Sequence, residues 1–203
     1  MHAAIAVLMD EHRIIERVLG SLETCALALE SGPAPDRETL RGYGDFFRLF
    51  ADRCHHGKEE DRLFAKMAQR GFPTEYGPIA VMLAEHVEGR ACVATLVRAG
   101  EGVGPLSEPE RIEVVEAARR YVPLLRAHIL KEDNILYPMA LQTLTLAEQD
   151  ELADSYGAFE RDAMGEGEHG RLHALAERLC ASYPPDPTRG SEASFCFGCS
   201  SHA

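Results

Sequence analysis

Residues 51–67 read ADRCHHGKEEDRLFAKM and combine a helical pattern of apolar residues with histidine and glutamate. Apolar side chains recur at the spacing of one helix face, at Leu49, Leu63, Phe64 and Met67. His56 and Glu60 lie on that face, one turn apart. The stretch therefore predicts a helix over about residues 36–69 whose buried face carries an imidazole and a carboxylate.

The same arrangement recurs in residues 123–139, PLLRAHILKEDNILYPM, where Glu132 follows His128 by four positions within an apolar stripe. Two further helical patterns each carry one histidine in the middle of the apolar face, His12 in the first and His86 in the third. A single buried histidine is usually a hydrogen-bonded core residue. Four of them, one on each long helix, indicate a shared site.

Glycine and proline divide the chain into helices with no strand pattern. We expect long helices at residues 3–30, 36–69, 78–99 and 107–141, followed by shorter ones at 145–163 and 168–182. Long helices joined by short loops form an up-down antiparallel bundle. The sequence thus predicts an all-α four-helix bundle over residues 1–165 and a C-terminal helix with a flexible tail over residues 166–203.

Composition limits the classes of partner. The 203 residues include 21 Lys and Arg against 33 Asp and Glu, a formal net charge of −12. Such an acidic chain is a poor ligand for nucleic acid or an anionic membrane. No apolar run approaches the roughly 20 residues of a membrane span, and the N-terminal segment does not have the pattern of a signal peptide. We therefore expect a cytoplasmic protein.

Two glutamates facing the axis of a bundle require a cation or a proton, because burial of an unpaired carboxylate is costly. Imidazole and carboxylate together are good ligands for iron and similar transition metals, and the set alone does not decide iron against manganese or zinc. His55 and Glu59 show the same spacing as His56 and Glu60, but their helix face carries charged residues, so we expect that face to be solvated. His169 is expected, with His173, on a solvated helix outside the bundle.

Four segments resemble those of hemerythrin-like (HHE cation-binding) proteins, in the order found in that family: LMDEHRII, HHGKEEDRLF, MLAEHVEGR and HILKEDNILYP. The resemblance covers about residues 3–165. It implies a bundle holding two iron ions in a non-haem, oxo- or hydroxo-bridged centre with bridging glutamates. The implied ligands are His12, His56, Glu60, His86, His128 and Glu132.

The third helix departs from the oxygen carriers, which the resemblance implies would have a second histidine four residues from His86. Arg90 stands four residues after it and Met82 four before. This departure argues against a pure oxygen carrier and favours a site that senses or reacts with oxygen, peroxide or nitric oxide. The leading hypothesis is a protein that binds or senses oxygen or nitric oxide, with a dry pocket for which we expect the lining residues Phe46, Phe50, Leu83, Leu125 and Leu136.

Two alternatives remain open at this level: an enzyme acting on peroxide or nitric oxide, as in the iron-centre-repair branch, and an iron store or donor. The enzyme needs proton delivery, for which Tyr43, Tyr121 and Tyr137 are candidates.

The cysteines fall into two groups. Four lie singly in helical patterns and are predicted to be buried, reduced thiols: Cys25, Cys54, Cys92 and Cys180. Cys196 and Cys199 form a CxxC followed by His202, a set too small to complete a metal site in one chain. Such a pair is also a candidate for a redox disulfide or for contact with a redox partner.

Overall fold

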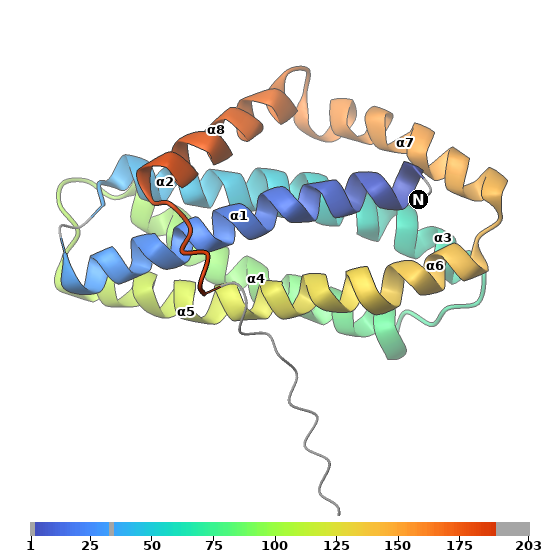
Figure 1. Ribbon diagram of the computed structural model, residues 1–203, viewed down its shortest axis with the longest axis horizontal. Coiled ribbons are helices and arrows are strands. Elements are labelled where there is room, and N and C mark those ends of the chain that lie inside the picture. Colours follow the sequence, from blue (N-terminus) through green and yellow to red (C-terminus); the bar gives the residue numbers. More distant parts are fainter. Residues whose placement is uncertain (1–2, 33–34, 190–203) are drawn as a thin grey trace, which may run out of the picture.

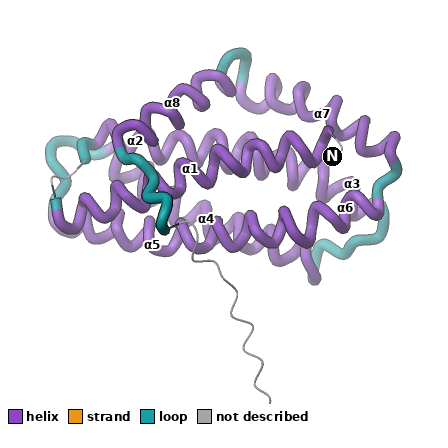
Figure 2. Tube along the Cα trace, in the orientation of Figure 1, coloured by secondary structure: helices purple, strands orange, loops and turns teal. Residues whose placement is uncertain are grey.

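The computed structural model describes residues 3–32 and 35–189, in which all regular structure is helical (Figures 1 and 2). The CxxC tail with Cys196, Cys199 and His202 lies outside this part of the chain. Four long helical rods run up and down and form a bundle, which confirms the predicted all-α architecture. The first rod is α1 (Ala3–Ser31), and the third is α4 (Gly77–Glu101).

Each of the other two rods is continuous but changes helix type along its length. The second consists of α2 (Arg37–Asp45), η1 (Phe46–His56), η2 (Glu59–Phe64) and α3 (Ala65–Gln69). The fourth consists of α5 (Glu108–Lys131), η3 (Glu132–Leu136) and α6 (Tyr137–Thr143).

Polar residues fix where the rods begin. The side chain of Asp36 accepts a hydrogen bond of 2.8 Å from the Thr39 amide at the start of the second rod. The Ser107 amide donates to Glu110 at 2.8 Å at the start of the fourth, as the sequence predicted. Pro123 lies inside α5 without ending it.

The segments η1, η2 and η3 are π-helical, with hydrogen bonds that span five residues instead of four. At the end of η1 the amide of Gly57 donates to the carbonyl of Asp52, five residues earlier. A π-turn holds more residues than an α-turn, so it changes which side chains face the bundle axis. Such turns occur frequently at functional sites.

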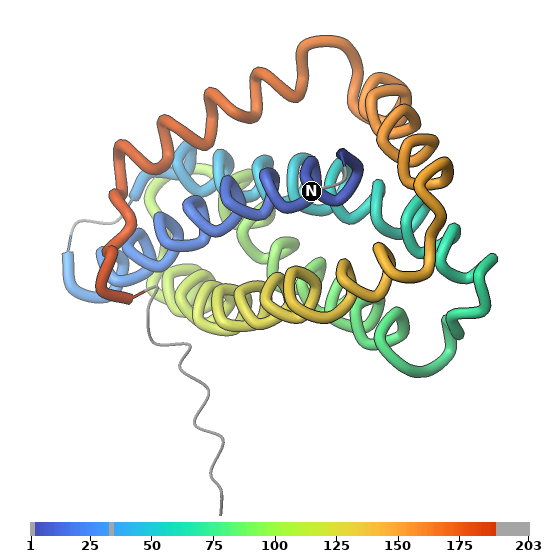
Figure 3. Tube along the Cα trace, turned by 45° about the vertical axis from the view of Figure 1, so that its right-hand side comes forward, coloured from blue at the N-terminus to red at the C-terminus, as the bar shows by residue number. Residues whose placement is uncertain are grey.

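Two more helices cover one side of the bundle. α7 (Leu146–Met164) and α8 (Glu168–Ser182) form an arch over α1 and the second rod (Figures 1 and 3). Leu172, Leu175 and Leu179 of α8 are buried in the same core as the bundle helices. Phe159 of α7 packs against Gly57 so closely that a Cβ there would lie 2.6 Å from its ring.

The apolar core is interrupted in the middle of the bundle. One cluster fills the end that contains Leu22 and Phe46, and a second fills the end that contains Leu8 and Met67. Between them each rod contributes buried polar residues instead of apolar ones. The sequence therefore builds a polar layer enclosed by apolar packing at both ends, and this layer holds the candidate site.

The four cysteines within the described residues, Cys25, Cys54, Cys92 and Cys180, are free and buried, as expected. No helix in residues 3–32 and 35–189 is both long enough and apolar enough to cross a membrane.

Candidate metal centre

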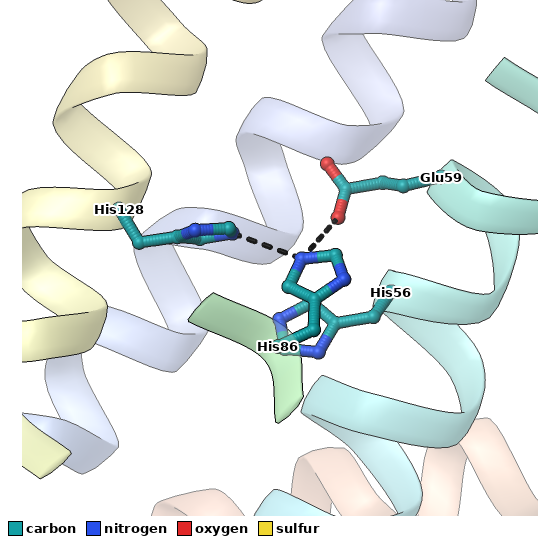
Figure 4. A group of neighbouring side chains, drawn as sticks. All are labelled: His56, Glu59, His86 and His128. Carbon is teal, nitrogen blue, oxygen red and sulfur yellow. Dashed lines mark hydrogen bonds and ion pairs between the residues drawn. The ribbon is translucent and has the colours of Figure 1, made fainter. Parts of the chain in front are cut away.

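Two groups of buried side chains meet in the polar layer, and Glu59 belongs to both. The first consists of His56, Glu59, His86 and His128, and the second of His12, His55, Glu59 and Glu132. Within each group the nitrogen and oxygen atoms that could bind a metal lie within 4.8 Å of one another. Figure 4 shows the first group, with side chains converging from η1, η2, α4 and α5. Two ions could therefore be held side by side.

The Nε2 atoms point toward the centre of the layer. The Nε2 atoms of His86 and His128 lie 3.1 Å apart (Figure 4). Glu132 Oε2 lies 3.3 Å from His12 Nε2 and 3.2 Å from His128 Nε2. Glu59 Oε2 lies 3.6 Å from His86 Nε2 and 3.7 Å from His55 Nε2. Both carboxylates thus contact imidazoles of two different rods.

The opposite nitrogen of every one of these five imidazoles faces a carboxylate. The Nδ1 distances are 2.7 Å from His12 to Asp133, 2.8 Å from His55 to Glu11, 3.4 Å from His56 to Asp52, 2.6 Å from His86 to Glu60 and 2.8 Å from His128 to Glu85. Metal-binding histidines commonly donate their second N–H to a carboxylate, which fixes the ring orientation and leaves Nε2 free for the ion. The whole set is therefore arranged as metal ligands are.

Cationic side chains hold those outer carboxylates in place. Arg13 pairs with Asp133, Lys58 with Glu11, and Lys131 with Glu85. Arg90 serves two of them, donating to Asp52 at 2.8 Å and to Glu60 at 2.7 Å. Each outer carboxylate is thus paired with a lysine or arginine, whereas among the described residues the two inner ones, Glu59 and Glu132, pair with imidazoles only.

The inner carboxylates, Glu59 and Glu132, lack both a lysine or arginine partner and a full set of hydrogen bonds within the part of the chain that the structure describes. Glu59 Oε2 and both oxygens of Glu132 are buried without a hydrogen-bond partner in the described chain. Burial and the neighbouring carboxylate raise the pKa of Glu59 well above its ordinary value. Burial also acts to raise the pKa of Glu132, but His128 and His12 outweigh it and hold that pKa well below the ordinary value.

One carboxyl of this pair therefore keeps its proton so that the other can be ionised. A divalent ion between them would stabilise both as carboxylates and would accept the orphan oxygens as ligands. The residues present therefore fit a metal centre.

The expectation that His55 and Glu59 lie on a solvated face is wrong. Both side chains are buried, His55 at 1 % exposure and Glu59 at 0 %. The π-helical turns of η1 and η2 bring an additional residue to the inner side. α7 also covers Lys58, which is buried and pairs with Glu160 at 2.7 Å.

Glu60, expected as a ligand, lies outside both groups in the structure. Its carboxylate is 26 % exposed and accepts hydrogen bonds from His86 Nδ1 and from Arg90. The geometry thus places Glu60 behind a histidine and Glu59 in the centre.

The other expected ligands come together: His12, His56, His86, His128 and Glu132. The sequence analysis missed His55 and Glu59 as members of the centre. The signal that could have found them is the pair of doublets His55-His56 and Glu59-Glu60, because either member of each doublet can face inward.

Of the tyrosines and phenylalanines named in the sequence analysis, one lies in the polar layer and the others lie in the apolar core. Tyr137 donates a hydrogen bond of 2.6 Å to Glu59 and lies 3.3 Å from His12 Nε2. Tyr43 bonds instead to Ser21 within the apolar core. Phe46 and Phe50 stack on each other in that core.

A third group of metal-binding side chains lies under the arch: Glu11, Cys54, Glu160 and His169. Lys58 already occupies it, with its ammonium paired to Glu11 and Glu160. Burial raises the pKa of the Cys54 thiol to about 12. His169 and His173 lie in ring contact with Phe50, half-buried, so the expectation of a solvated helix for them is wrong. We interpret this group as a buried ion-pair network.

Comparison with known proteins agrees with the geometry. Residues 3–140 match the hemerythrin HHE cation-binding domain. Uncharacterized proteins of Mycobacterium bovis and Mycobacterium tuberculosis are 22 % identical over 159 residues, which is 78 % of this chain and 62 % of theirs. The chain thus spans less than two thirds of these relatives' length. No solved structure matches the chain. With its family match and its converging histidines and glutamates, the chain is a metal-binding helical domain that belongs to the hemerythrin HHE cation-binding family.

Proposed function

We propose that this protein binds two iron ions in the polar layer and uses them to bind or sense a small diatomic molecule, oxygen or nitric oxide. His56, His86 and His128 would hold one ion and His12 and His55 the other, and Glu59 and Glu132 would be shared between them. This assignment replaces Glu60 of the sequence-based ligand set with Glu59 and adds His55.

The unpartnered oxygens of Glu59 and Glu132 are the observation that carries this proposal. Among the described residues, two buried carboxylates beside five imidazoles have no lysine or arginine of their own, whereas every outer carboxylate has one. Two divalent ions bring about four positive charges, which two glutamates offset in part. Bound iron supplies a redox-active centre with affinity for oxygen and nitric oxide.

The histidine count bears on the choice between binding and turnover. Arg90 stands where the oxygen carriers were expected to have a further histidine, and His55 contributes an additional imidazole from the second rod instead. Its ring lies against that of His12, with centroids 4.6 Å apart. A fifth imidazole leaves fewer open coordination positions than the four expected from the sequence. This supports binding or sensing over an open catalytic site.

One contact favours the enzymatic alternative, in which the centre acts on peroxide or nitric oxide. Tyr137 is buried, and its hydroxyl contacts both Glu59 and His12. Such a hydroxyl can donate a hydrogen bond to a molecule bound between those residues. Tyr137→Phe would then reduce turnover without changing the iron content.

Optical titration of the anaerobically reconstituted protein distinguishes these roles. An oxygen-dependent band that disappears on deoxygenation supports binding or sensing. Irreversible oxidation, with turnover of added peroxide or nitric oxide, supports the enzyme. A protein that takes up no iron after reconstitution contradicts both.

A further inference from the structure

A surface groove between α4 and the second rod reaches one side chain of the metal centre. It has a volume of about 480 Å³, and His56 lies in its lining. His56 has the largest exposed fraction among the seven side chains of the centre, although it is still only 4 % exposed. The groove therefore connects solvent with one of the imidazoles assigned to iron.

The groove follows one face of α4. Its α4 residues span positions 89–101, a distance of roughly 18 Å at 1.5 Å per residue. Part of its wall consists of small, apolar or aromatic residues: Gly89, Val93, Ala94, Val97 and Tyr121. Gly89 is packed tightly there, since a Cβ at this position would lie 3.2 Å from the Tyr121 ring. The wall formed by α4 and Tyr121 is thus closely packed and largely apolar.

The guanidinium groups along the groove are already paired. Arg48 pairs with Asp45 at 2.9 Å and Arg98 with Glu113 at 3.0 Å. Arg90 pairs with both Asp52 and Glu60. None of these arginines offers an uncompensated charge to an anion, and the chain as a whole carries −12. An apolar passage with compensated charge favours small neutral molecules over anions.

The opposite side of the centre is covered. α7 and α8 lie over α1 and η1, with Phe159 against Gly57 and Lys58 buried between Glu11 and Glu160. A small molecule approaching from that side would have to cross a packed ion-pair network. A surface groove of about 530 Å³ does run past Gly57 and Phe159, but none of the seven side chains of the centre lines it, whereas His56 lines the groove along α4.

We propose that this groove is the route by which a neutral diatomic molecule, oxygen or nitric oxide, reaches the centre. The inference rests on the proposed function, because it presupposes that iron is bound in the polar layer. It adds a path, a selectivity for uncharged ligands and the residues that control the passage.

Two exposed alanines of α4 provide a matched test. Ala94 lines the groove, whereas Ala91 lies on a neighbouring surface toward α5. Ala94→Trp should obstruct the passage, and Ala91→Trp adds the same side chain elsewhere on the same helix. Ala94→Leu is a smaller obstruction that decides the question if the tryptophan variant fails to retain two irons.

The measurement is the association rate constant of nitric oxide with the reduced, iron-loaded protein, by stopped-flow absorbance. We expect at least a tenfold decrease for Ala94→Trp at unchanged iron content, a smaller decrease for Ala94→Leu, and a change of less than twofold for Ala91→Trp. Equal rates for wild type and Ala94→Trp, or equal slowing by both tryptophans, overturns the proposed route.

Azide provides an anionic probe of the oxidised protein. If Ala94→Trp slows azide but leaves nitric oxide unchanged, the groove admits anions and the proposed selectivity is wrong. Failure of the proposed function has a different signature: wild type itself then holds no iron or, fully loaded, binds no nitric oxide. In that case both the proposed function and the proposed route are wrong. If wild type binds nitric oxide normally and Ala94→Trp binds it at the same rate, only the route is wrong.

Discussion

The Nδ1 atom of His86 lies 2.6 Å from a carboxylate oxygen of Glu60. Glu60 therefore contacts the outer edge of an imidazole whose Nε2 faces the centre, and Arg90 holds the carboxylate from the solvent side. Histidine ligands are oriented by such carboxylates, and loss of one typically weakens metal binding 10- to 100-fold without abolishing it.

Arg90 should tune metal affinity because it holds the carboxylates behind both His56 and His86. Arg90→Met is expected to weaken iron binding by about 10- to 100-fold, measured by competition with a chelator. Arg98→Met is the matched control, since Arg98 on the same helix pairs with Glu113 only. Equal affinities for wild type and Arg90→Met would contradict this role.

Glu59 should reduce the stability of the metal-free protein at neutral pH. Because its pKa is raised in the folded chain, Glu59 keeps a proton there that the unfolded chain releases above pH 4.5. The protonated side chain contributes its full stability below pH 4.5, and that stability is lost as pH rises through the folded-state pKa. Metal-free Glu59→Gln should therefore unfold less readily than wild type at pH 7. The expected gain is about 1.4 kcal/mol per unit of pKa shift and disappears near pH 4, measured by urea unfolding.

Glu60→Gln is a control variant for which the expected change in stability has the opposite sign. Burial acts to raise the pKa of Glu60, but His86 and Arg90 outweigh it and lower that pKa. Its ionised form thus stabilises the fold above pH 4.5, and this stabilisation is lost as pH falls through the lowered pKa. Metal-free Glu60→Gln should be less stable than wild type at pH 7. The same sign of change in both variants would refute the inner and outer assignment.

Metal removal should lower the melting temperature, because only the folded chain brings the seven proposed ligands together. At a free metal concentration about 1,000 times the Kd, binding contributes about 4.1 kcal/mol. In a protein of this size each kcal/mol shifts Tm by about 2–4 °C, so chelation should lower Tm by about 8–16 °C. Calorimetry before and after chelation tests this, and an unchanged Tm would indicate that the polar layer holds no ion.

α8 should stabilise the bundle as a part of its core. Leu172 is 0 % exposed within the bundle core. Leu172→Ala is expected to cost about 2–5 kcal/mol in the free energy of unfolding, measured with denaturant. Ile112→Ala, at a position half exposed on α5, should have little effect. Similar small effects of both substitutions would mean that α8 is a peripheral helix.

The fold could be predicted from the sequence because it depends on local patterns. Apolar residues at helical spacing, with breakers between them, predicted the four rods and both covering helices to within a few residues. Burial of α8 was not evident, because its apolar stripe is short and its histidines suggested a solvated helix.

The centre was predicted in part. His12, His86 and His128 each lie in an α-helix and Glu132 directly follows α5, so their inward orientation follows from the α-helical spacing of the apolar residues. The doublets His55-His56 and Glu59-Glu60 could not be resolved in that way, because the π-helical hydrogen bonds of η1 and η2 do not follow an α-helical period. Nor could the sequence pair His86 with Glu60 or His12 with Asp133, since both contacts join different rods.

The most direct test of the account is the number of irons per chain in wild type, Glu59→Ala and Glu60→Ala after anaerobic reconstitution, measured by metal analysis. The account predicts two irons in wild type, two more weakly held in Glu60→Ala, and at most one in Glu59→Ala. Two irons in Glu59→Ala together with a loss in Glu60→Ala would contradict it and would restore Glu60 as the bridging ligand.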